Sequence, residues 1–104
     1  DELILVAHRD ALGQPALRAF LNALERGVQF LLNHPNDAWS LFVQAYPDLD
    51  DELNVRAWHD TLPRFALRPA AFDRARYERF AAFLVERGLL DEALPASAYA
   101  VELE

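Results

Sequence analysis

The 104-residue sequence has no cysteine and no methionine, and all ten of its basic residues are arginine. Without cysteine, neither disulfide bonds nor thiolate metal sites can form. The net charge of -7 argues against a nucleic-acid partner, because binding to a phosphate backbone needs clustered cations. It argues equally against a basic helix on a membrane surface. No apolar run approaches the roughly 18 residues of a membrane-spanning helix.

Hydrophobic residues make up 53% of the sequence and charged residues 26%. This balance is typical of a folded domain and not of a disordered tail, and the length allows one domain at most. Because the sequence contains no methionine, we expect that Asp1 is not a translation start. The sequence predicts a single fragment, residues 1–104, of a larger protein, because the apolar run near its start is typical of a strand whose sheet these residues do not supply.

A continuous apolar run, Leu3 to Ala7, lies near the start of the sequence and is followed by His8-Arg9-Asp10. Such a run is typical of a strand buried on both faces of a parallel sheet, so we predict a strand over 3–8. Its one candidate partner in this chain is the short run Tyr99 to Leu103. An unpaired strand is costly to bury and adhesive when exposed, so we expect self-association of the isolated chain through this strand.

Helical spacing of apolar residues predicts helices at about 15–33, 36–46, 50–62 and 70–87. Pro15 and Pro35 suit first helical positions, and Gly88 suits the end of the last helix. Asp48 or Asp50 could cap the third helix. The fold class that follows is α/β but mainly helical: one N-terminal strand and three to four helices, forming the C-terminal part of a larger protein.

Gly27 lies inside the apolar stripe of the first predicted helix, where glycine costs about 1 kcal/mol relative to alanine. It could mark a close approach of another element, or a break between two shorter helices.

Few residues of the sequence suggest a metal-binding or catalytic site. His8, His34 and His59 are too far apart in sequence for the usual metal-ligand spacings, so we predict neither a metal site nor catalytic residues. Phosphate-binding loops and nucleophile motifs are absent too, and we predict a protein that is not an enzyme and needs no cofactor.

Two residues are candidates for ligand binding. We favour a core-packing role for Trp58, but its amphipathic ring could also line a cleft and stack on a flat heterocycle. Arg64 could pair with an anionic ligand, or with Asp60 or the acidic stretch near residue 50. Trp39 lies on an apolar helix stripe, where core packing is the expected role.

Several stretches resemble a known family. They are the helix end Leu31-Leu32-Asn33-His34-Pro35, the run Ala57-Trp58-His59-Asp60-Thr61-Leu62-Pro63-Arg64-Phe65, and Glu86-Arg87-Gly88-Leu89-Leu90. The chain is similar to the C-terminal part of the substrate-binding proteins of bacterial ABC importers for thiamine-precursor pyrimidines, in the thiamine-biosynthesis-like group of periplasmic binding proteins. The resemblance covers nearly the whole chain.

The resemblance implies a type II periplasmic-binding-protein fold, in which two lobes close on a ligand. It also implies a hydroxymethylpyrimidine or a formylated relative as ligand, an ABC permease as partner, and a periplasmic or membrane-anchored extracytoplasmic location. Most pocket residues of the family would lie outside this sequence.

Two other interpretations stay open. One is a small helical module that binds a protein partner through an aromatic groove. The other is a fragment of a pyrimidine-precursor synthase, an enzyme whose cysteine-rich motif would also lie outside these residues.

Overall fold

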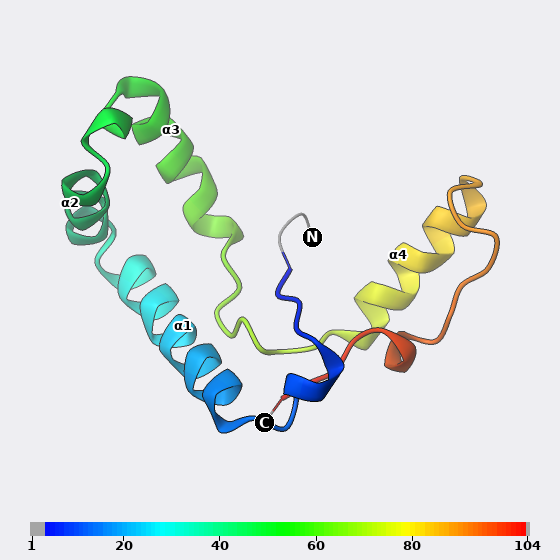
Figure 1. Cartoon of the computed structure of the whole chain (residues 1–104). Coiled ribbons are helices and arrows are strands. Elements are labelled where there is room, and N and C mark those ends of the chain that lie inside the picture. Colours follow the sequence, from blue (N-terminus) through cyan, green and yellow to red (C-terminus); the bar gives the residue numbers. More distant parts are fainter. Residues whose placement is uncertain (1–3, 104) are drawn as a thin grey trace. The chain divides into compact units, whose positions relative to one another are not determined.

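The computed structural model describes residues 4–103 as a set of helices (Figure 1). The α-helices are α1 (Pro15–Asn33), α2 (Pro35–Ala45), α3 (Glu52–Thr61) and α4 (Arg74–Glu86). Short 3-10 turns are η1 (Arg9–Ala11), η2 (Pro47–Leu49), η3 (Leu62–Arg64) and η4 (Ala96–Ala98). The chain divides into two compact units, one up to Pro69 and one from Ala70 onward. The first unit contains α1 to α3, and the second contains α4 and η4.

The predicted strand over 3–8 is wrong, and with it the α/β fold class. No strand occurs within residues 4–103, although the mainly helical character agrees with the prediction. Leu3 lies outside the described residues. Ile4, Leu5 and Val6 are 60%, 52% and 85% exposed, and His8 already accepts a hydrogen bond from the backbone of Asp10 as the cap of η1. An apolar run becomes a strand only when another strand satisfies its backbone, and the expected partner run near Tyr99 is also unpaired.

Helices α1 and α2 meet at His34, which is both the last cap of α1 and the first cap of α2. Pro15 and Pro35 occupy the first helical positions, where a missing N–H costs nothing. Leu21 and Val28 are the buried residues of α1, seven positions apart and so on one face. Ala38 is the buried residue of α2.

Gly27 interrupts neither the helix nor its packing. Helix α1 runs without a break through this position, and a Cβ built there would meet nothing within 4 Å. Neither explanation offered by the sequence, a break or a close approach, therefore holds among the described residues.

The start of α3 is fixed by Asp51, and not by Asp48 or Asp50 as the sequence suggested. Its Oδ1 accepts a hydrogen bond of 2.8 Å from the backbone N–H of Asn54, and its Oδ2 accepts one of 3.0 Å from the Asn54 side chain. One carboxylate thus satisfies an otherwise unpaired helix donor and also orients Asn54.

In the second unit, α4 has a polar cap at one end and a glycine at the other. The Asp73 carboxylate accepts a hydrogen bond of 3.1 Å from the backbone of Arg76, so the helix begins later than the predicted residue 70. Gly88 has a φ of 70°, and its N–H donates to the carbonyl of Val85 while the N–H of Leu89 donates to that of Leu84. This pair of bonds is the Schellman motif, in which glycine avoids the steric cost of a positive φ.

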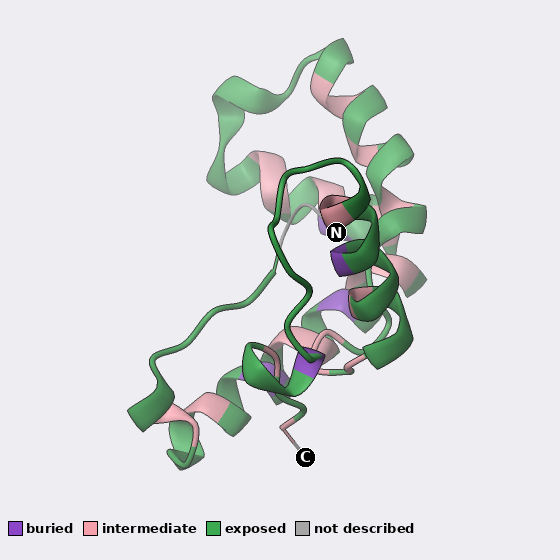
Figure 2. Ribbon diagram, turned by 90° about the vertical axis from the view of Figure 1, so that its right-hand side faces the viewer, coloured by how far each residue is buried: buried purple, intermediate pink, exposed green. Residues whose placement is uncertain are grey.

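Little of the chain is buried (Figure 2). Within residues 4–103 the buried residues are Leu21, Val28, Ala38, Ala81 and Ala96. Large apolar side chains in the first unit stay more than a third exposed, among them Phe20, Phe30, Leu41, Tyr46, Leu53 and Phe65. Helices with so much exposed apolar surface lack the cover that normally stabilises an amphipathic helix. None of the described helices is long and apolar enough to cross a membrane.

Candidate functional site: an aromatic groove between α2 and α3

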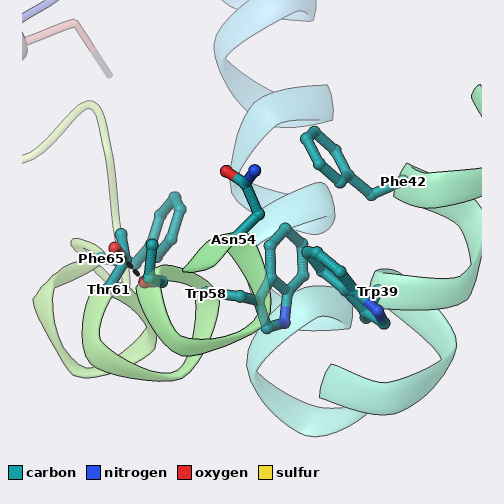
Figure 3. Close-up of a pocket in the computed structure, with 7 residues that line it drawn as sticks. Trp39, Phe42, Asn54, Trp58, Thr61 and Phe65 are labelled. Carbon is teal, nitrogen blue, oxygen red and sulfur yellow. Dashed lines mark hydrogen bonds between the residues drawn. The ribbon is translucent and has the colours of Figure 1, made fainter. Parts of the chain in front are cut away.

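Three aromatic rings from two helices meet in the first unit (Figure 3). Trp39 and Phe42 lie three positions apart on α2, so their side chains share a face of that helix. Trp58 comes from α3 and contacts both. Its ring centroid lies 5.3 Å from that of Trp39, at an interplanar angle of 63°, and 5.5 Å from that of Phe42. These distances and the edge-on Trp39–Trp58 geometry are favourable for aromatic pairs.

These rings form part of a groove of about 250 Å³, which we call the aromatic groove. Its lining residues are Trp39, Phe42, Asn54, Ala57, Trp58, Thr61 and Phe65. The volume falls below the range of about 300–1,000 Å³ that is typical of small-molecule sites. A depression of about 420 Å³ lies over the first turn of α3, but exposed residues of one helix end line it, and it has no aromatic wall.

Two polar side chains that line the aromatic groove are committed to local hydrogen bonds. Asn54 donates to the Asp51 carboxylate, and the Thr61 hydroxyl donates to the carbonyl of Ala57 at 2.6 Å. The indole Nε1 of Trp58 is buried and has no acceptor. A buried donor without a partner costs about 1–3 kcal/mol, and no described residue offsets this cost.

The two predicted ligand-binding residues lie near each other in sequence but differ in position. Trp58 is in the aromatic groove. Arg64 lies at the end of η3, is exposed and is not among the lining residues. It makes no ion pair with a described residue, neither with Asp60 nor with the acidic stretch. The structure therefore brings only one of the two candidates to the groove.

The histidines do not form a site. His8 caps η1, His59 lies in the last turn of α3, and the ring of His34 lies 5.3 Å from that of Phe30. In the described part of the chain, no group of three or more histidine, aspartate or glutamate residues could hold a metal ion. What the groove offers is binding chemistry: ring faces against which an apolar or planar group can pack.

Sequence reasoning overlooked the partners of Trp58. Trp39 was expected to be core, and Phe42 and Asn54 were not considered as a site. The signal was available in part, because Trp39 and Phe42 share a helix face and Trp58 lies on the next helix along the chain. Nothing in the sequence indicated that the two helices would bring these rings together.

Comparison with known proteins gives one informative relative. The chain is 45% identical over 105 residues to the Haemophilus influenzae protein named "Putative thiamine biosynthesis protein". The chain is similar to a protein named for thiamine biosynthesis. The match covers 100% of this chain but 33% of the relative, so the chain spans about a third of the length of the curated relative it matches.

No protein-family model matches the chain, and no solved structure matches it either. The expected relation to thiamine-linked proteins is confirmed by the relative's name, and by nothing finer than that name. The relative's name mentions neither transport nor a pyrimidine.

Proposed function

We propose that this chain is part of a longer solute-binding protein that delivers a thiamine-precursor pyrimidine to an ABC importer. The observation that carries the proposal is the 45% identity across the whole chain to a protein named for thiamine biosynthesis. The resemblance of the stretches around Trp58 and Gly88 to thiamine-precursor receptors gives the finer assignment. The protein would act outside the cytoplasm, periplasmic or membrane-anchored, and would bind its ligand without transforming it.

In this proposal the helices described above support the binding protein, and the ligand cleft is completed by residues outside this chain. The free chain, meaning residues 1–104 alone, would then bind the pyrimidine weakly or not at all. The longer protein, meaning the natural protein that contains these residues, would bind it through contacts on more than one side of the ring.

The experiment is calorimetric titration of the longer protein with 4-amino-5-hydroxymethyl-2-methylpyrimidine, beside thiamine and cytosine as controls. We expect saturable one-to-one binding of the pyrimidine, much weaker binding of the controls, and no binding by the free chain. Absence of pyrimidine binding by the longer protein would refute the transport function.

A second candidate is a fragment of a pyrimidine-precursor synthase, and the word "biosynthesis" in the relative's name favours it. An enzyme of this kind would depend on iron and on cysteines outside these residues. Mass spectrometry distinguishes the two functions: a binding protein returns the pyrimidine unchanged, whereas a synthase forms it in an iron-dependent reaction.

A further inference from the structure

The exposed side of α4 combines arginine with phenylalanine. Arg79 and Phe83 each lie two positions from Ala81, the buried residue of this helix, and so about 200° around the helix from it. Phe80 and Phe83 are 55% and 44% exposed, and their rings stack with centroids 6.4 Å apart. The guanidinium carbon of Arg87 lies 5.3 Å from the centroid of the Phe83 ring. We call these four residues the arginine face of α4: Arg79, Phe80, Phe83 and Arg87.

The chemistry of the arginine face matches carboxylates that stand beside apolar side chains. Neither Arg79 nor Arg87 makes an ion pair with a described residue. A guanidinium that stacks on a ring keeps its N–H groups at its edge, where they fit the two oxygens of a carboxylate. Arginine and aromatic residues are also enriched in the centres of protein interfaces, because they bury a large area and make directed polar contacts.

The first unit of the same chain contains a segment of this complementary kind, residues 48–53, which we call the acidic stretch. Four of its residues are acidic and two are leucine. Leu49 is 38% exposed and Leu53 is 75% exposed. Apart from Asp51, which caps α3, none of its carboxylates makes a hydrogen bond or an ion pair with a described residue. The acidic stretch therefore offers both the charge and the apolar groups that the arginine face lacks.

The local charges of the two segments are opposite although the chain as a whole is acidic. Residues 74–87 carry four arginines and two glutamates, whereas the acidic stretch carries no basic residue. At physiological salt the screening length is about 8 Å, so the like net charges of two copies repel each other little, while groups in contact still attract. Because every chain carries one segment of each kind, two copies can make the same contact twice, as symmetric dimers do.

We propose that the arginine face of α4 docks on the acidic stretch of a second copy of the protein, and the reverse. Arg79 and Arg87 pair with carboxylates of the acidic stretch, and the two phenylalanine rings pack on its exposed leucines. The association is weak, because exposed ion pairs contribute little individually. It does not rest on the proposed function, since neither the pyrimidine nor the permease takes part in it.

The test is sedimentation equilibrium of the longer protein, without ligand, at physiological salt and over a series of concentrations. We expect a dimer whose fraction rises with concentration. Arg79→Glu combined with Arg87→Glu should weaken the dimer at least about tenfold, because attraction at the contact becomes repulsion. The matched control is Arg18→Glu combined with Arg26→Glu, which reverses two exposed arginines of α1 at the same spacing and should leave the dimer unchanged.

Mixing two variants separates a lost contact from a damaged fold. Asp48→Arg combined with Asp50→Arg reverses charge on the acidic stretch and should also weaken the dimer of that variant. A mixture of this variant with the Arg79→Glu, Arg87→Glu variant should dimerise again. One contact in the mixed dimer is then the native one, and the other has both of its charges reversed.

Three results would overturn the proposal. A monomer at every concentration would mean that another part of the longer protein, or a different acidic partner, covers the arginine face. A dimer that is equally stable in the α4 variant and in the α1 control would place the contact elsewhere. Failure of the mixed variants to dimerise would show that the arginine face and the acidic stretch do not pair.

Discussion

At the scale of single residues, the structure depends on a few polar caps. Asp51 is the clearest, because its carboxylate accepts hydrogen bonds from both the backbone and the side chain of Asn54. Removing it leaves a helix donor without its partner and frees a side chain that lines the aromatic groove. The loss of stability is confined to α3. It can therefore be measured by comparison with the same substitution at a neighbouring acidic residue.

We predict that Asp51→Ala lowers the free energy of unfolding by about 1 kcal/mol, as is usual for the loss of an N-cap. Asp48→Ala is the matched control, because it removes the same charge in η2 without removing a helix cap. Urea unfolding monitored by circular dichroism, at one ionic strength, compares them. Equal effects of the two substitutions would contradict the capping role.

The same glycine-to-alanine change should have opposite signs at two positions. Gly27→Ala should raise the free energy of unfolding by about 0.5–1 kcal/mol, because α1 has open space there and alanine is the better helix former. Gly88→Ala should lower it by about 1–2 kcal/mol, because its φ of 70° strains any residue with a Cβ. Thermal unfolding of both variants tests this. A shift of the unfolding midpoint in the same direction for both would contradict the different backbone roles assigned to Gly27 and Gly88.

At the scale of elements, the second unit is held together by a small interface between α4 and η4. Ala96 of η4 is 0% exposed, and the Tyr77 ring of α4 lies 6.1 Å from that of Tyr99. Close packing around an alanine leaves no room for a larger side chain. Stability of this unit should therefore be sensitive to volume at position 96.

We predict that Ala96→Leu loosens the second unit, at a cost of about 1–3 kcal/mol for overpacking. Ala98→Leu in the same turn is the control, because Ala98 is exposed. Hydrogen exchange of the α4 amides is the measurement. Exchange should quicken in the first variant and stay unchanged in the second, and equal protection in both would show that Ala96 is not tightly packed.

The helices were largely predictable from sequence because their signals are local. Leu21 and Val28 set the face of α1, and Gly88 marked the end of α4. The strand over 3–8 failed because a strand depends on a distant partner, and an apolar run such as Leu3 to Ala7 does not specify one. The candidate site was half predicted: Trp58 stood out, but its contact with Trp39 depends on how α2 meets α3.

At the scale of the whole molecule, charge gives a prediction about partners. The net charge of -7 repels a polyanion, and the arginines are interspersed with acids. We expect no change in the fluorescence anisotropy of labelled duplex DNA when micromolar free chain is added at low salt, where electrostatic binding is strongest. Saturable binding that weakens with salt would contradict this.

Self-association through a strand loses its structural basis, because residues 4–7 form no strand. Within residues 4–103 the structure leaves many aromatic and aliphatic side chains of α1 to α3 uncovered. Amphipathic helices owe most of their stability to packing, so these helices should gain stability when the rest of a longer protein covers them. The exposed apolar side chains are the physical reason for regarding the chain as one part of a larger structure.

The intact mass of the natural protein that contains these residues, purified from its own cells with a tag placed after them, tests that claim most directly. Our account predicts a mass about three times the 11.8 kDa of this chain, as the relative's length implies. A natural product of 11.8 kDa would contradict it, since no further polypeptide would then be present to cover the exposed apolar side chains.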